Sequence, residues 1–313
     1  MAGDQMRVAV MGAGAVGSYF GGMLVRAGVP VTLIGRRGHV EAIEREGLFI
    51  DSIHFQQRIN VAASADAAAV RGAGIVLFCV KTLDTETAAR EMAKHLDAGT
   101  IVVSMQNGVD NVERIRAASG IDALPAVVFV AASMPAPGRV KHAGRGDLVV
   151  GHATRGSEVQ RVAEVFTRAG VKCSVTRNIE GELWHKLVWN CAGNALTALG
   201  RASYGQVAVS EPARQVMAAT VEEVTAVARA AGIEMPPVDL VGTGLKLAAD
   251  LGPATSSTEQ DVERGRRTEI DSLNGYVARR GAELGVPTPV NQTLWALVKL
   301  LEESRQSAAA SAG

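Results

Sequence analysis

The sequence has few cysteines, few aromatic residues and no net charge. Its three cysteines, Cys79, Cys173 and Cys191, are far apart and each lies in an apolar stretch, which is typical of reduced core thiols. No Cys-x-x-Cys pair is present, so the sequence does not indicate a dithiol redox centre. Basic and acidic residues number 32 each, which leaves no general electrostatic attraction for nucleic acid or for an anionic membrane. A small molecule is therefore the favoured partner.

Long apolar runs, targeting segments and metal-ligand clusters are also missing. No run approaches the roughly 18 apolar residues of a membrane span, and the apolar run near the N-terminus is too short for a signal peptide. We therefore expect a cytoplasmic protein with no membrane partner. None of the six histidines has the spacing of a metal site, so no metal is predicted. Residues 1–5 and 307–313 lack apolar periodicity and are expected to be frayed.

The length of 313 residues favours two domains over one. Between residues 6 and 176, short and continuously apolar β-type runs alternate with helical stretches, which is typical of a mostly parallel sheet covered by helices. The β-type runs are residues 7–12, 29–35, 74–80, 100–105, 126–133 and 171–176, with a hairpin-like excursion at 139–151 and helices at 18–28 and 158–169.

The character of the sequence changes after residue 178, where no further β-type run occurs. Five stretches look helical, at residues 180–199, 211–231, 239–251, 258–284 and 290–303. We therefore predict an α/β Rossmann-type domain over residues 1–177, followed by an all-α domain over residues 178–313. No helix of the second domain has a sustained heptad seam, which leaves monomer and homodimer open.

A glycine-rich loop follows the first predicted strand and opens a helix, the context in which the G-x-G-x-x-G pattern indicates dinucleotide binding. Its residues are Gly12, Ala13, Gly14, Ala15, Val16 and Gly17. Gly12 would make the tight turn, Gly14 would let the backbone approach the pyrophosphate, and Gly17 would let the helix pack close to the sheet. The amides at the helix N-terminus would face the anion. The alternative is a glycine-rich turn without a ligand.

Basic residues end the second predicted strand, where an NAD-specific protein would place an acidic residue for the ribose 2′-hydroxyl. Arg36 and Arg37 stand there instead. Hydrogen bonds from an arginine to a 2′-phosphate are worth roughly 1.5–3 kcal/mol, or about one to two decades of preference, so NADPH is favoured over NADH. Lys81 and Asn107 each follow a later strand and would face the nicotinamide half of the cofactor. The alternatives are solvated arginines, a loop lysine and a plain Asn-Gly turn.

Three polar residues recur at four-residue intervals on a nearly apolar helix in the second domain. They are Lys186, Asn190 and Asn194, and this spacing puts them on one face. Buried polar groups need partners, and a bound carbonyl compound would supply them, with the lysine donating to the carbonyl oxygen as hydride arrives at the carbon. A solvated stripe is the alternative. His185 points about a quarter-turn away and is expected to pack or to cap.

Taken together, these residues resemble the ketopantoate reductases (2-dehydropantoate 2-reductases), in the right order from residue 6 to about residue 291. The most specific stretches are residues 186–194, Ser256-Ser257, residues 267–271 and Asn274-Gly275. On residues alone, the two serines would be read as a helix cap and the acidic residues after them, Asp261, Glu269 and Asp271, as a solvated face.

The resemblance implies roles for individual residues. Lys186 matches the proton donor, and Asn190, Asn194 and Ser257 match residues that hold the substrate. Glu269 matches a residue beside cofactor and substrate. Arg36 matches the residue that binds the 2′-phosphate of the cofactor. Lys81 and Asn107 match residues on the cofactor side of the site. The chain departs from well-known members at Tyr204 and Ala254, where they have asparagines lining the substrate pocket, and at Asp84, where one has glutamine.

The leading hypothesis is an NADP-dependent oxidoreductase that reduces 2-dehydropantoate to (R)-pantoate, a step toward pantothenate and coenzyme A. The keto acid would bind between the domains. Because of the departures, a reductase of another 2-oxo acid stays open. A β-hydroxyacid-dehydrogenase-like enzyme is also possible, although residues 257–269 argue against it. A regulator that senses NADPH without chemistry would have no need of a proton donor such as Lys186.

Overall fold

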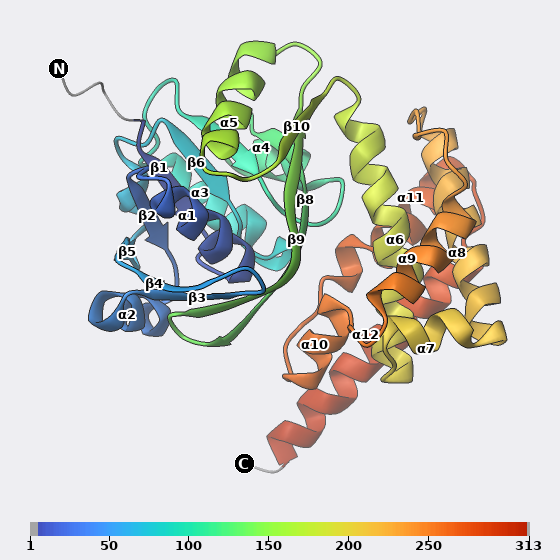
Figure 1. The fold of residues 1–313 in the computed structure, drawn as a ribbon. Helices are drawn as coiled ribbons and strands as arrows, with labels where there is room; N and C mark the ends of the chain where they lie inside the picture. Colours follow the sequence, from blue (N-terminus) through green and yellow to red (C-terminus); the bar gives the residue numbers. More distant parts are fainter. Residues whose placement is uncertain (1–5, 312–313) are drawn as a thin grey trace. The chain divides into compact units, whose positions relative to one another are not determined.

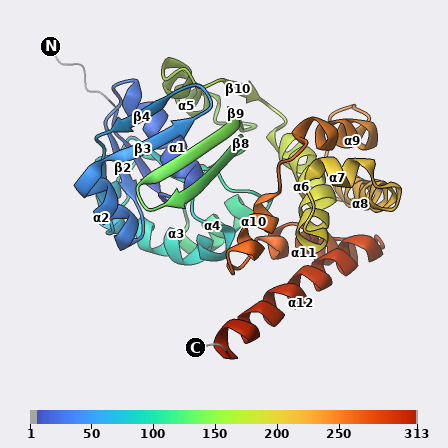
Figure 2. The ribbon, with the colours of Figure 1, turned by 60° about the horizontal axis from the view of Figure 1, so that its bottom comes forward.

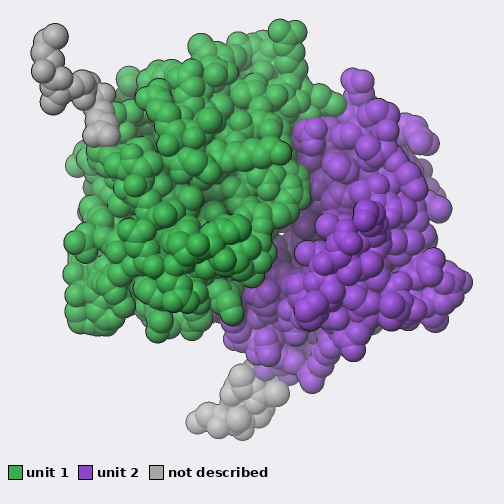
Figure 3. Space-filling model, in the orientation of Figure 1, with its two compact units in different colours: residues 1–179 green, residues 180–313 purple. Residues whose placement is uncertain are grey.

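The computed structural model describes residues 6–311, with side chains described through Arg305. The chain divides into two compact units, residues 1–179 and residues 180–313 (Figure 3). Unit 1 is an α/β unit and unit 2 is all-helical. The predicted fold class is therefore confirmed. No helix in the described part of the chain is long and apolar enough to cross a membrane.

Unit 1 is built on a ten-stranded sheet in the order β4-β3-β9-β8-β7-β6-β1-β2-β5, with β10 paired to β9. The strands are β1 Val8–Met11, β2 Val31–Ile34, β3 Leu48–Ser52, β4 Gln56–Ile59, β5 Ala62–Ser64, β6 Ile75–Phe78, β7 Ile101–Ser104, β8 Leu124–Ala136, β9 Arg139–Gly151 and β10 Cys173–Thr176. Among the described strands, only the pairs β3–β4 and β8–β9 are antiparallel, so the sheet is mostly parallel as predicted. The β8–β9 pair is the long green hairpin in Figure 2.

Helices cover both faces of this sheet (Figure 1). They are α1 Ala15–Arg26, α2 Arg37–Glu46, α3 Thr85–Ala93, α4 Asn111–Ser119 and α5 Gly156–Arg168, with short 3₁₀ turns η1 Ala67–Val70 and η2 Thr82–Asp84. Alternate residues of β1 enter two different hydrophobic clusters, because successive strand side chains point to opposite faces. Val8 and Val10 pack in the cluster that contains Phe20 of α1, whereas Ala9 packs in the cluster that contains Met92 of α3.

Three strands, β3, β4 and β5, were not predicted from the sequence. The first alternates in burial, the second has three exposed residues out of four, and the third is only three residues long. Continuous apolar runs mark only strands buried on both faces, so short or half-exposed strands of this kind lack that signal.

Unit 2 contains α6 Ile179–Gly200, α7 Tyr204–Val209, α8 Glu211–Ala230, α9 Leu240–Leu251, α10 Ser257–Glu263, the 3₁₀ turn η3 Ile270–Ser272, α11 Asn274–Leu284 and α12 Pro289–Ser311. The long helix α12 packs along α11 and α8 (Figure 2). α7 was not predicted from the sequence.

Two predictions for unit 2 are wrong. The stretch 258–284 is not one helix, because α10 ends near Gly265, whose φ of +64° is left-handed. The C-terminal stretch was expected to be frayed, but α12 continues to Ser311 through an alanine-rich sequence of high helix propensity. Residues 1–5 and 312–313, which were also expected to be frayed, lie outside the described residues.

Candidate functional site

The glycine-rich loop lies at the carboxyl end of β1 and leads directly into α1. Gly12 has a φ of +105°, and a Cβ on it would lie 2.5 Å from the backbone nitrogen of Val80. A Cβ on Gly17 would collide with the carbonyl oxygen of Gly12 and lie 2.7 Å from Cγ1 of Val10. A Cβ on Gly14 would meet nothing within 4 Å. Gly12 and Gly17 are therefore required by the fold, whereas Gly14 borders open space.

The N-terminus of α1 is suited to an anion. Gly14 is its N-cap and is exposed, no side chain caps it, and no acidic residue lies in the first turn. The first amides of a helix have no intrahelical acceptor and carry a partial positive charge. This arrangement fits the pyrophosphate of a dinucleotide, and the exposed Gly14 allows the close approach that a pyrophosphate needs.

A chain of hydrogen bonds through the buried His39, called here the His39 relay, connects the glycine-rich loop to neighbouring elements. The amide of Gly138 donates to Nδ1 of His39 at 2.9 Å, so the proton of the neutral ring is on Nε2, which lies 3.2 Å from the hydroxyl of Ser18. That hydroxyl donates in turn to the carbonyl oxygen of Ala13 at 3.1 Å. Burial lowers the pKa of His39. The relay connects α2 and the β8–β9 turn to the loop, and it requires a neutral His39.

The His39 relay predicts a loss of stability at acid pH. Because burial lowers the pKa of His39 in the folded state, the unfolded chain takes up a proton first as the pH falls below about 6.5. The free energy of unfolding should then fall by up to about 1.4 kcal/mol per pH unit until the folded pKa is reached. Denaturant unfolding of wild type and His39→Gln between neutral and acid pH measures this share. The exposed His54 provides the control His54→Gln, and equal pH dependence in all three proteins would contradict the prediction.

The proposed 2′-phosphate reader is exposed at the carboxyl end of β2. Arg36 is the N-cap of α2, and its Nη2 lies 3.8 Å from Oδ2 of Asp84. Asp84, one of the departures from the resembled family, thus lies next to the proposed reader. Both side chains are more than half exposed, and an exposed pair of this kind is worth about 0–1 kcal/mol. The pair leaves Arg36 available to a stronger anion.

The turns after β6 and β7, which were predicted to face the cofactor, are joined by a buried glutamine. Nε2 of Gln106 donates to the carbonyl oxygen of Val80 at 3.1 Å and to the hydroxyl of Thr85 at 2.7 Å. Lys81 begins the exposed turn after β6, and Asn107 follows Gln106. Because the carboxyl ends of parallel strands meet at one edge of a sheet, both turns lie on the edge that carries the glycine-rich loop.

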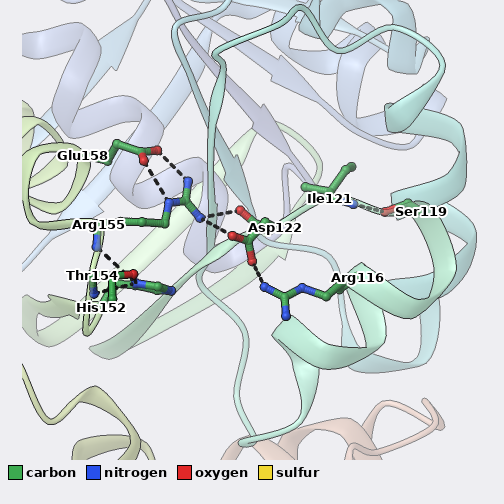
Figure 4. Close-up of polar contacts among 8 residues, drawn as sticks. All are labelled: Arg116, Ser119, Ile121, Asp122, His152, Thr154, Arg155 and Glu158. Carbon is green, nitrogen blue, oxygen red and sulfur yellow. Dashed lines mark hydrogen bonds and ion pairs between the residues drawn. The ribbon is translucent and has the colours of Figure 1, made fainter.

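The hollow of about 570 Å³ in unit 1 lies at the opposite edge of the sheet. It is lined by residues 99–101 before and at the start of β7, residues 119–122 after α4, and Arg155. The charged groups there satisfy one another: Arg155 pairs with Glu158 and Asp122, and Asp122 also pairs with Arg116 (Figure 4). The hollow is therefore separate from the dinucleotide edge, and it contributes nothing to the candidate site.

In unit 2, the predicted polar face lies on α6. Asn194 is only 4% exposed, and Lys186 and Asn190 are half-buried. The other sides of the helix are apolar, with Leu187 and Ala195 fully buried. A solvated stripe would be exposed along its length, so this partly buried polar face is not a solvated stripe.

His185 lies off the polar face of α6. It packs edge-on against Trp189, with ring centroids 5.4 Å apart, and burial lowers its pKa. This position fits the expected packing role. The three cysteines are free thiols, and burial raises the pKa of each.

The two serines after α9 have different positions. Ser256 is buried and caps α10 by accepting from the amide of Glu259 at 3.0 Å, while its hydroxyl donates to the carbonyl oxygen of Asn194 at 3.3 Å. Ser257 is exposed at the first position of α10. Ser256, rather than Ser257, therefore connects α10 to the polar face of α6. Thr197 joins them by donating to Ser256 at 2.6 Å.

The half-buried Glu269 lies in a segment that α12 holds in place. The amide of Thr268 donates to Oε1 of the buried Glu302 at 2.6 Å. Burial would raise the pKa of Asp271, but hydrogen bonds from Lys299 and Trp295 lower it overall. The reading of these acidic residues as a solvated face is wrong, because tertiary contacts hold Asp271 and bury Asp261, which is 6% exposed.

Several residues around the site were given no role from sequence. Gln106 directly precedes Asn107, and Thr197 lies about one helical turn after Asn194. This proximity to predicted site residues was the signal by which they could have been found. Glu302 is 33 positions from Glu269 and carries no local motif. No group of three or more His, Cys, Asp or Glu side chains within the described residues is placed to hold a metal ion.

Both units match known protein families. Residues 8–155 match the family described as ketopantoate reductase PanE/ApbA, and residues 178–302 match ketopantoate reductase PanE/ApbA C terminal. A 2-dehydropantoate 2-reductase of Pyrococcus horikoshii is 33% identical over 301 residues, which are 95% of this chain and 98% of the relative.

Solved structures extend the comparison. A PanE/ApbA family ketopantoate reductase from Ralstonia eutropha JMP134 is 46% identical, with a TM-score of 0.91 over 96% of this chain and 100% of its own. D-mandelate dehydrogenase with NADH and anilino(oxo)acetate is 24% identical, with a TM-score of 0.89 over 96% of this chain and 100% of its own, and shares the fold.

Fold and matches together define an enzyme of the pyridine-nucleotide oxidoreductase class. Within that class, the chain belongs to the ketopantoate reductase family. The resemblance seen in the sequence is thereby confirmed.

Proposed function

We propose that this enzyme reduces 2-dehydropantoate to (R)-pantoate with NADPH, a step toward pantothenate and coenzyme A. The observation that carries the proposal is the buried polar face of α6, where Lys186, Asn190 and Asn194 interrupt an otherwise apolar helix. The names of the relatives support the same reaction. A biosynthetic reduction of a small 2-oxo acid is consistent with a cytoplasmic enzyme, acting as a monomer or a homodimer.

In this proposal unit 1 supplies the cofactor residues. The glycine-rich loop receives the pyrophosphate, Arg36 holds the 2′-phosphate, and Lys81 and Asn107 lie toward the nicotinamide. Glu269 of unit 2 contributes beside cofactor and substrate. The exposed Gly14 and the uncapped start of α1 support the first assignment.

Unit 2 supplies the substrate residues and the proton. Bound NADPH supplies a hydride to the carbonyl carbon of the 2-oxo acid. Lys186 donates a proton from Nζ to the carbonyl oxygen as negative charge develops there, so that the C=O bond becomes an alcohol. Asn190, Asn194 and Ser257 orient the carboxylate and the hydroxyl of the substrate, which fixes the carbonyl in front of Lys186.

A second candidate is the reduction of a related 2-oxo acid without the hydroxyl group. One observation favours it: two of the three departures from the family are neighbours, because the amide of Tyr204 donates to the carbonyl oxygen of Ala254 at 2.9 Å. A tyrosine and an alanine at these positions offer fewer polar groups than two asparagines. Steady-state NADPH oxidation with 2-dehydropantoate and with 3,3-dimethyl-2-oxobutanoate, which lacks only the hydroxyl, decides between the two by their kcat/KM.

Reversing the charge of Arg36 is expected to reverse the cofactor preference. Arg36→Asp would remove the proposed contact to the 2′-phosphate and place a negative charge beside it, lowering the NADPH/NADH ratio of kcat/KM by about 10–100-fold. Arg45→Asp makes the same charge change at the other end of α2 and should leave the ratio unchanged. An unchanged ratio in Arg36→Asp would mean that Arg36 is only a solvated surface residue.

A further inference from the structure

Tyr204 hydrogen-bonds directly to one of the proposed substrate residues. Its hydroxyl donates to Oδ1 of Asn194 at 3.0 Å. The Asn194 side chain lies in a site that is only 4% exposed, and its Nδ2 makes no hydrogen bond to any of the described residues. Nδ2 is not among the described buried atoms that lack a partner, so it borders solvent, where a ligand can accept from its two N–H groups.

The structure around Tyr204 fixes the position of its ring. Ser203 and Gln206 form a capping box at the start of α7, which holds the backbone of Tyr204. The ring packs on Gly193 of α6, where a Cβ would lie only 2.7 Å from the ring carbon Cε1. Any larger residue at position 193 would displace the ring, so Gly193 and the capping box together aim the hydroxyl at Asn194.

The backbone of Asn194 is held separately. Its carbonyl oxygen accepts from the hydroxyl of Ser256 at 3.3 Å, and Ser256 in turn accepts from the hydroxyl of Thr197 at 2.6 Å. These bonds fix where the residue sits but not which way its carboxamide faces. In the structure the Tyr204 hydroxyl donates to Oδ1, and this leaves Nδ2, which can only donate, on the side of the carboxamide away from that hydroxyl.

We propose that Tyr204 is a positioning residue for substrate binding. By occupying Oδ1, it turns the N–H groups of Asn194 toward the carboxylate of a 2-oxo acid, which is an acceptor-only group. This inference rests on the proposed function, since it needs an anionic substrate at α6. Burial also raises the pKa of Tyr204 to about 12, so the hydroxyl keeps its proton throughout the neutral range.

The Tyr204→Phe variant tests the proposal, because it removes only the hydroxyl. At saturating NADPH, the KM for 2-dehydropantoate should rise about tenfold, as expected for the loss of one oriented hydrogen bond. kcat should change less than about twofold, because uniform binding of ground state and transition state is what is lost. The KM for NADPH should stay the same. Tyr276→Phe, which removes the same group from α11, is the matched control.

A double-mutant cycle shows whether Tyr204 acts through Asn194. Asn194→Ala alone should raise the KM for 2-dehydropantoate at least as much as Tyr204→Phe, and adding Tyr204→Phe to it should have no further effect. Asn194→Asp replaces the Nδ2 donor by an acceptor without changing size, so it should raise the KM more than Asn194→Ala. This last variant leaves Tyr204 intact and decides the question even if Tyr204→Phe does not fold.

Three results would overturn the role of Tyr204. They are a KM in Tyr204→Phe equal to that of the wild type, a tenfold effect that persists in the Asn194→Ala background, and an unchanged KM in Asn194→Asp. Calorimetric binding of oxamate, a 2-oxo acid analogue that is not reduced, separates this failure from failure of the proposed function. If the wild type neither reduces 2-dehydropantoate nor binds oxamate with NADP⁺ present, both proposals fail together.

Discussion

The Lys186→Ala variant is expected to lose about 10²–10⁴-fold in kcat with 2-dehydropantoate, because a positioned general acid contributes about that factor. Lys186 lies half-buried on the polar face of α6 with Asn190 and Asn194. Without its Nζ, the developing alkoxide would receive neither a proton nor a stabilising charge. Stopped-flow or steady-state NADPH oxidation measures the loss.

Two further variants make the Lys186 result specific. Lys186→Arg keeps the positive charge, but arginine does not give up a proton near neutral pH, so its kcat should remain low. Lys246→Ala removes an exposed lysine of α9 that pairs with Asp250 and should leave kcat unchanged. If Lys186→Ala kept most of its kcat, Lys186 would not be the proton donor. Full rescue by arginine would assign it an electrostatic role instead.

The second large effect is expected in the glycine-rich loop, where two alanine substitutions should fail in different ways. Gly17→Ala places a Cβ against the carbonyl oxygen of Gly12 and 2.7 Å from Val10, and overpacking of this kind should lower the free energy of unfolding by about 3 kcal/mol. Gly14→Ala meets open space in an extended backbone conformation that any residue adopts. Its stability should change by less than about 0.5 kcal/mol.

Gly14→Ala should weaken NADPH binding even though it leaves the stability of the protein nearly unchanged. A methyl group on Gly14 would stand where the backbone must approach the pyrophosphate, so the Kd for NADPH should rise about 10–100-fold, or roughly 1.4–2.8 kcal/mol. Denaturant unfolding and NADPH titration of both variants measure the two quantities. A Gly14→Ala protein that binds NADPH like the wild type would contradict the assignment of this loop to the pyrophosphate.

The sequence predicted the parts of the fold that have a local signal. Strands buried on both faces are continuous apolar runs, and the turn from β1 to α1 contains the required glycines, so both could be identified. The break between α10 and α11 has one local signal, a glycine after α10, and one determinant without any local signal. It depends on Gly265 adopting a left-handed conformation and on Glu302, far along the chain, accepting from the amide of Thr268.

The candidate site likewise has a part that could be predicted from the sequence and a part that could not. Periodicity alone places Lys186, Asn190 and Asn194 on one face of α6. Periodicity does not reveal that Tyr204 bonds to Asn194, or that His39 holds the glycine-rich loop through Ser18, because these contacts form only when separate elements pack together. The resemblance to the family marked Tyr204 only as a difference from other members. Its hydrogen bond to Asn194 became visible only in the structure.

We have proposed that this chain carries out the NADPH-dependent reduction of 2-dehydropantoate. The most direct test is to incubate the purified protein with both compounds and to follow NADPH consumption together with the product by chiral chromatography. We expect one (R)-pantoate to be formed for each NADPH oxidised. No NADPH consumption, or consumption without pantoate, would contradict it.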